Sequence, residues 1–382
     1  MPEENKRIKE NELDGVTFPV ITDRHTWQGK RRRIRNIIYG ICGFLLITGV
    51  FLLLFKAYQS YGKSRLDDYA ATHGDHDIDS FRADIAEPGS GEEYEELPEG
   101  QIVYKGRLYE YNDDIMSFLV LGVDSRIGLS DVKIPGYGGN ADMIALVVLD
   151  EAAKSLKLIY ISRDIMVPVQ TFSTDGFYTG KQEMQLTLQY SYGDGREKSI
   201  RLMEEAVSEL FYRIPIYGAG AIEMEGIGVL NDAVDGITLT VIEDLTKRNA
   251  KLKEGETVTL LGNMALDYIQ YRDIHVRESN NMRIARQKQY IGAFFARVKE
   301  KTKENLTFPL RLYGAAKDHV LTAITTDQIA YLSTAVMGCS FTEEDMFSVT
   351  GSITKPDLYE EFRVNEEELH ELIIEVFYRP ID

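Results

Sequence analysis

The chain has 382 residues, of which 44% are hydrophobic and 27% charged, an ordinary globular composition that excludes disorder throughout. Its formal net charge of −18 argues against a nucleic-acid-binding protein, because neutralising phosphates requires a basic face. Two cysteines and six scattered histidines without ligand spacing give no support to disulfide, redox or zinc chemistry.

The first predicted element is the uncharged apolar run 37–55. At about 1.5 Å per residue, such a helix covers the roughly 30 Å hydrocarbon core of a bilayer, and it exceeds a signal-peptide h-region. A cluster of basic residues precedes it: Lys30, Arg31, Arg32, Arg33 and Arg35. The positive-inside rule therefore predicts a single-pass cell-membrane protein with residues 1–36 in the cytoplasm and the C-terminal domain outside.

The next stretch, 56–101, becomes rich in acidic residues, Gly, Ser and Pro, which predicts a solvated extracellular spacer. Order begins near Ile102. Three apolar, β-rich runs follow at 117–123, 143–149 and 156–162, and such runs are typical of central strands in a sheet that is covered on both faces.

Helical and strand patterns then alternate. Apolar residues recur at spacings of three and four over 197–212 and again over 283–299, which predicts two amphipathic helices, and 236–242 predicts another strand. This interleaving predicts a layered α/β/α domain with a central mixed sheet over 102–382, preceded by the one N-terminal transmembrane helix.

Charged residues gather where these elements end. Asp124 and Arg126 follow the first central strand, Asp142 begins the second, and Arg163 follows the third. Carboxylates such as Asp124 and Asp142 suit Mg²⁺, and arginine forks clamp phosphate oxygens. For any one of these residues, a surface ion pair is the plainer interpretation.

More such residues lie further along the chain. Arg272 follows the segment YIQY, and Arg283, Arg286 and Gln287 are spaced to share one face of a helix.

Six ordered segments within 117–299 resemble the LytR-CpsA-Psr family of cell-wall phosphotransferases. They are FLVLGVDSR, ADMIALVVLD, LKLIYISRD, IEMEGIGVLNDAVDGITLTV, GNMALDYIQYRD and RIARQKQYIGAFFARV. The resemblance implies transfer of an anionic glycopolymer from an undecaprenyl-pyrophosphate carrier to peptidoglycan or another cell-wall acceptor of a Gram-positive-type wall. It also implies Mg²⁺ at the pyrophosphate and the lipid in an apolar tunnel.

The same resemblance implies roles for individual residues. Asp124 and Asp142 match the metal-associated aspartates, and the expected catalytic residues are Arg163, Arg272 and Arg283. The expected phosphate-binding set is Arg126, Arg163, Arg272, Arg283, Arg286 and Gln287.

Four positions depart from the family pattern. Asn140 and Gln270 stand where the family usually has arginines, Gln185 where it has lysine, and Ile284 replaces a common glutamine. A lost charge-assisted hydrogen bond is worth about 1.5–3 kcal/mol. An alternative function is therefore a non-catalytic, polyprenyl-phosphate-binding or regulatory protein of cell-wall assembly.

Overall fold

The computed structural model describes residues 10–13, 16–19, 53–72, 76–86, 97–124, 132, 134–271, 279–354 and 361–381. The chain forms two units, Met1–Ala57 and Tyr58–Asp382. In the first unit, β1 (Glu10–Leu13) pairs with β2 (Val16–Pro19) as an antiparallel hairpin. The predicted transmembrane helix lies outside the described residues over 37–52; among the residues that are described, no helix is both long and apolar enough to cross a membrane.

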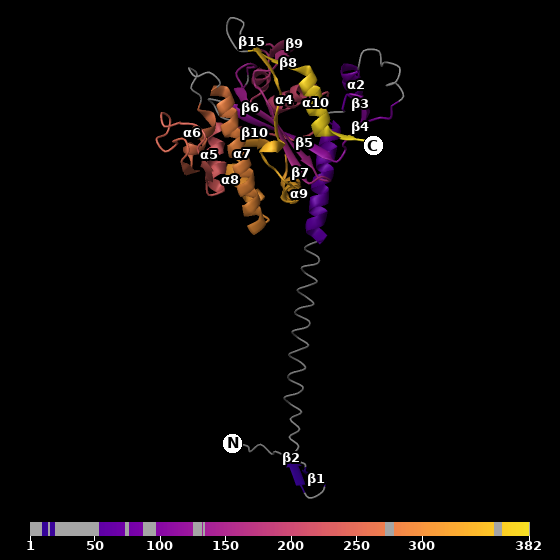
Figure 1. The fold of residues 1–382 in the computed structure, drawn as a ribbon, viewed down its shortest axis with the longest axis vertical. Helices are drawn as coiled ribbons and strands as arrows, with labels where there is room; N and C mark the ends of the chain where they lie inside the picture. Colours follow the sequence, from indigo (N-terminus) through magenta and orange to yellow (C-terminus); the bar gives the residue numbers. More distant parts are fainter. Residues whose placement is uncertain are drawn as a thin grey trace. The chain divides into compact units, whose positions relative to one another are not determined.

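A six-stranded mixed sheet forms the centre of the second unit (Figure 1). Its spatial order is β13 (Val320–Thr322), β10 (Ile216–Glu223), β5 (Ile115–Asp124), β6 (Asn140–Asp150), β7 (Ser155–Ile161) and β14 (Met346–Ser348). The β10–β5 and β7–β14 pairs are parallel, and the other three pairs are antiparallel. The predicted α/β domain with a mixed central sheet is confirmed.

Helices cover both faces of this sheet, and Figure 1 shows α7 and α10 on opposite sides of the strands. One face packs against α3 (Thr187–Ser191), α4 (Glu197–Leu210) and α10 (Glu366–Phe377) in a single apolar core. The opposite face lies under α5 (Met224–Ala233), α6 (Asn263–Gln270), α7 (Ser279–Glu304), α8 (Phe308–Ala316) and α9 (Thr326–Met337).

The central strands are buried on both faces because nearly every residue in them is apolar. In β5, nine of the ten residues are buried or half-buried and only Asp124 is exposed. Alternate side chains therefore enter opposite layers, with Leu119 and Leu121 in the core under α4 and Val120 and Gly122 on the other face.

Smaller sheets surround the central one. They pair β3 (Gln101–Tyr104) and β17 (Tyr378–Pro380) with β4 (Arg107–Tyr111), β8 (Met166–Phe172) with β9 (Tyr178–Gln185), β11 (Ile237–Thr240) with β12 (Thr257–Leu260), and β15 (Gly351–Thr354) with β16 (Glu361–Val364). The strand predicted at 236–242 is thus β11, but it belongs to a two-stranded sheet and not to the central one.

Parts of the stretch 56–101, the predicted solvated spacer, are helical and bury a few apolar side chains, whereas most of its described residues are exposed or half-buried. Residues 58–72 are helical, and Leu66 is fully buried. Gly62 brings this helix so close to the backbone of Asp327 on α9 that a Cβ there would clash. Further along, α2 (Ile78–Ile85) buries Phe81 against the main core. The sequence did not indicate these contacts, because the few apolar residues of this stretch are scattered among many acidic ones.

Candidate active site

The strand register brings an aspartate and an arginine together at one edge of the sheet. Asn140 at the start of β6 lies opposite Asp124 at the end of β5, and Ile144 lies opposite Ile161 across β6–β7. The chain just beyond β7 therefore passes beside the start of β6. The guanidinium of Arg163 forms an ion pair with Asp142 there, with 2.5 Å between Nη1 and Oδ1.

Carboxylates outnumber cations among the described groups of this edge. The Arg163 Nε also lies 3.7 Å from Asp164 Oδ1, and the Gln185 side-chain amide donates to the same oxygen at 3.1 Å. Burial alone would lower the pKa of Arg163, but the carboxylates of Asp142, Asp164 and Asp124 together raise it. Arg163 therefore stays a cation held in one orientation.

This donor set suits a hard divalent cation. Asp124 is exposed at the end of β5, and Asp142 is about one-fifth exposed, so their carboxylate oxygens can be approached from the same edge. Mg²⁺ is usually bound by one or two carboxylates together with substrate phosphate oxygens. A phosphate group approaching three carboxylates would also need added positive charge. The predicted pair Asp124 and Asp142 thus fits Mg²⁺ on chemistry.

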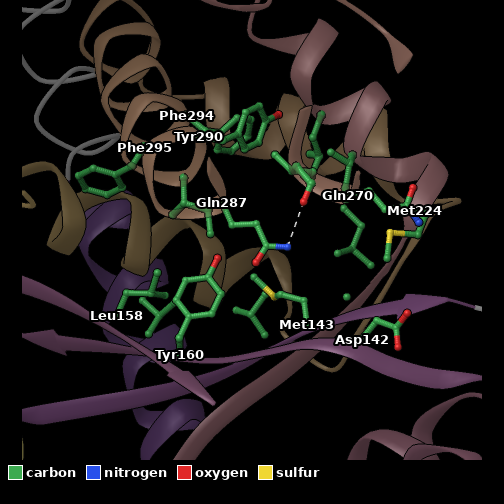
Figure 2. Close-up of a pocket in the computed structure, with 18 of the residues that line it drawn as sticks. Asp142, Met143, Leu158, Tyr160, Met224, Gln270, Gln287, Tyr290, Phe294 and Phe295 are labelled. Atoms are coloured by element: carbon green, nitrogen blue, oxygen red, sulfur yellow. Dashed lines mark hydrogen bonds between the residues drawn. The ribbon is translucent and has the colours of Figure 1, made fainter. Parts of the chain in front are cut away.

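A cavity of about 430 Å³ lies between the sheet and helices α5–α8. Apolar residues form most of its wall: Val120, Val147 and Leu158 from the sheet, and Ile227, Phe294 and Leu312 from the helices. Figure 2 shows Asp142 towards one end of the cavity and Leu158 and Phe295 towards the other. Because Asp142 belongs both to the wall and to the ion pair with Arg163, the apolar cavity opens onto the charged edge.

Polar side chains from α6 and α7 also reach the cavity. Gln270, Arg283 and Gln287 line it, so two of the predicted residues on α7 are placed at the same cavity as Asp142. The Gln287 side-chain amide donates to the backbone carbonyl of Ile269 at 3.2 Å, which fixes its orientation (Figure 2).

Arg286 has a different environment from its neighbours on α7. It is 1% exposed, and its guanidinium donates to the backbone carbonyls of Tyr268 and Tyr271 and lies 3.0 Å from Glu243. It is not part of the cavity wall among the described residues. These contacts tie α7 to the end of α6, and the expected phosphate contact of Arg286 stays a prediction.

Two predicted arginines have no described position. Arg126 and Arg272 lie outside the described residues, in 125–131 and 272–278. Their expected roles therefore stay predictions. Two of the four departures from the family pattern lie at this site: Asn140 lies beside Asp124, and Gln270 lines the cavity.

The sequence did not indicate a second group of ligand-type residues. Glu223, Glu225 and His319 place one ligand atom each within 4.8 Å of one another, and His319 Nδ1 contacts the Glu223 carboxylate. Glu223 ends β10 opposite Val123, so this group lies on the same sheet edge as Asp124. His319 is 96 residues from Glu223, which is why spacing could not reveal the group.

The model of the LytR_cpsA_psr family matches residues 86–375, which is more than half of the chain. The chain belongs to the LytR_cpsA_psr family. Every described residue of the sheet edge and the cavity falls within this match.

Sequence relatives in the family carry named activities. The chain is 27% identical over 240 residues to the polyisoprenyl-teichoic acid–peptidoglycan teichoic acid transferase TagV of Bacillus subtilis, covering 61% of this chain and 56% of TagV. It is 25% identical over 243 residues to TagU of Halalkalibacterium halodurans, a transferase of the same description, covering 63% of this chain and 71% of TagU.

Solved structures share the fold. The crystal structure of B. subtilis TagV matches with a TM-score of 0.53 and 23% identity, over 69% of this chain and 97% of that one. The structure of TagT bound to LI-WTA matches with a TM-score of 0.51 and 20% identity, over 69% of this chain and 90% of that one.

Proposed function

We propose that this protein transfers an anionic glycopolymer from an undecaprenyl-pyrophosphate carrier to peptidoglycan or another cell-wall acceptor. One observation carries the proposal: an apolar cavity of about 430 Å³ opens at Asp142 onto the ion pair with Arg163. A lipid pyrophosphate has the same division into an apolar chain and a charged head. The named activities of TagV and TagU support this class of substrate.

The residues divide between holding the lipid and acting on the head group. The apolar wall binds part of the polyprenyl chain, and 430 Å³ lies within the usual range of about 300–1,000 Å³ for ligand sites. Bound at Asp124 and Asp142, Mg²⁺ would neutralise pyrophosphate oxygens. Arg163, held by Asp142 and Asp164, faces the charge that develops as the phosphoanhydride bond breaks. Arg283 in the cavity wall and Arg272 beyond α6 are the other proposed catalytic cations.

Such a reaction places the domain on the outer surface of the cell membrane. The uncharged run 37–55 and the basic residues before it support a single span with the N-terminus in the cytoplasm. Protease added to intact cells should then digest Tyr58–Asp382 and spare the N-terminal tail; protection of the large unit would reverse the proposed topology.

The test of catalysis is Arg163→Ala, assayed as glycan transfer from a synthetic polyprenyl-pyrophosphate donor to peptidoglycan fragments with magnesium present. We expect a loss of about a hundredfold or more, the usual effect of removing one donor that stabilises transition-state charge. Arg363→Ala is the matched control, because Arg363 also pairs with two carboxylates, Glu183 and Glu361, but on an exposed hairpin. Equal activity of the two variants would contradict the proposed role of Arg163.

A second function, binding without catalysis, is favoured by Gln270. It lines the cavity as a neutral amide, at a position where the family pattern has a cation. If the wild-type protein binds the lipid pyrophosphate without transferring glycan, and Asn140→Arg with Gln270→Arg starts transfer, the binding function is the correct one. Transfer by the wild type excludes it.

A further inference from the structure

Tyr160 places a hydroxyl group in the cavity wall that meets no hydrogen-bond partner in the described part of the chain. The residue lies within β7, it is 7% exposed, and its ring lines the cavity beside Leu158. Its hydroxyl oxygen, drawn in Figure 2, is buried and has no hydrogen-bond partner among the residues that the structure describes. A buried polar group left without a partner costs about 1–3 kcal/mol, so an unsatisfied hydroxyl in an apolar wall needs an explanation.

The surroundings of Tyr160 favour a negatively charged partner. Arg283 lines the same cavity and acts electrostatically on Tyr160. Burial raises the pKa of the Tyr160 hydroxyl and Arg283 opposes that rise only in part, so the group keeps its proton at physiological pH. A protonated hydroxyl near a guanidinium is suited to donate to an anionic oxygen.

A second tyrosine in the same wall shows what a purely structural hydroxyl looks like. Tyr290 on α7 is 6% exposed and lines the cavity, but its hydroxyl donates to Asn231 Oδ1 at 3.2 Å. The protein itself therefore satisfies Tyr290. The two tyrosines have similar burial, but only the Tyr290 hydroxyl has a hydrogen-bond partner among the described residues.

We propose that the Tyr160 hydroxyl donates a hydrogen bond to a phosphate oxygen of the bound polyprenyl carrier, and that with Arg283 it forms an anion subsite inside the cavity. This inference rests on the proposed function and extends it. Tyr160 lies inside strand β7, three residues before Arg163, and lines the cavity, so it adds a donor on the cavity side of the proposed head-group site. Tyr160 is thus a specificity-determining residue, which favours a phosphorylated polyprenyl lipid over the uncharged alcohol.

The experiment compares Tyr160→Phe with Tyr290→Phe in the full chain in detergent. Two probes, polyprenyl monophosphate and the matching polyprenol, are titrated calorimetrically, and thermal unfolding is recorded without ligand. For Tyr160→Phe we expect affinity for the phosphate lipid to fall about tenfold or more, with affinity for polyprenol and the melting temperature not lowered. For Tyr290→Phe we expect a lower melting temperature and an unchanged ratio of the two affinities.

The ratio of the two affinities separates a ligand contact from a packing effect, because a structural change alters binding of both lipids together. If Tyr160→Phe leaves the ratio unchanged while the wild type binds the phosphate lipid, the inference is overturned and the proposed function stands. If the wild type binds neither lipid, both are overturned.

Discussion

The two faces of the central sheet are built from the same strands and have opposite properties. On one face, Leu121 of β5 and Val148 of β6 are at most 1% exposed and pack in one continuous core with α4 and α10. On the other face, Val120 and Val147, each the neighbour of one of these residues, border a cavity of about 430 Å³. Side-chain alternation alone cannot explain this difference, because both sets of residues are apolar.

The helices over the hollow face have a core of their own. Residues of α6, α7 and α8 pack with β11 and the loop after it in a separate cluster that includes Leu245, Tyr268 and Phe308. The helices over the closed face bury their apolar residues against the sheet itself. A layer that is stabilised internally does not need to collapse onto the strands, and this lets a cavity persist in a domain that is otherwise closely packed.

The largest difference between the two faces should be the loss of unfolding free energy when neighbouring residues of β7 are truncated to alanine. Ile159→Ala removes a fully buried side chain from the closed face and should cost about 2–5 kcal/mol of unfolding free energy. Leu158 already borders the cavity, so Leu158→Ala should cost at least about 1 kcal/mol less. Chemical denaturation of both variants measures the difference. Equal losses would show that the hollow face is packed as tightly as the closed one.

A smaller effect is expected from enlarging neighbouring valines of β6. Val147→Phe points into the cavity and should leave stability nearly unchanged, while weakening polyprenyl phosphate binding about tenfold by displacing roughly two methylene groups of lipid. Val148→Phe overpacks the closed face and should cost about 1–3 kcal/mol of stability. Thermal unfolding and lipid titration of the pair check both expectations. Normal lipid binding by Val147→Phe would mean that the lipid does not use this part of the cavity.

The smallest effect should be a pH dependence confined to the closed face. Burial of His370 on α10 lowers its pKa from the ordinary value of 6.5, opposed by the charges of Asp84, Glu366 and Glu367. The unfolded chain therefore binds the proton more readily, so this contribution to stability is complete above about pH 6.5 and decreases as the pH falls below it. Denaturation at pH 7.5 and pH 5.5 should show a smaller decrease for His370→Gln than for the wild type. An identical decrease would show that His370 does not contribute.

The local sequence pattern was sufficient to predict those strands and helices whose residues are uniformly apolar or strictly periodic. The runs 117–123, 143–149 and 156–162 became β5, β6 and β7, and the helix predicted over 197–212 is α4. It was insufficient where a few apolar residues are spread among charged ones, as in the helix of 58–72 that buries Leu66. In such a segment the deciding contact is with α9, more than 250 residues away, and no local window contains it.

The residues of the candidate site also divide into those that the sequence could predict and those that it could not. Asp124, Asp142 and Arg163 could be found from the sequence because each lies at the end of a recognisable strand. Arg283, Arg286 and Gln287 could be placed on one helix, but their spacing did not show that Arg286 is buried against the end of α6. The orphan hydroxyl of Tyr160 and the group around His319 depend on neighbours from other elements and had no local signal.

The sequence by itself determined the α/β class, the central strands, the family and the charged residues at strand ends, because these follow from local periodicity and from short ordered segments. Only the tertiary structure decided that one face of the sheet is closed and the other hollow, and which polar groups face the cavity. Those outcomes depend on how separately stabilised layers pack together, and on whether each buried polar atom meets a partner from a distant part of the chain.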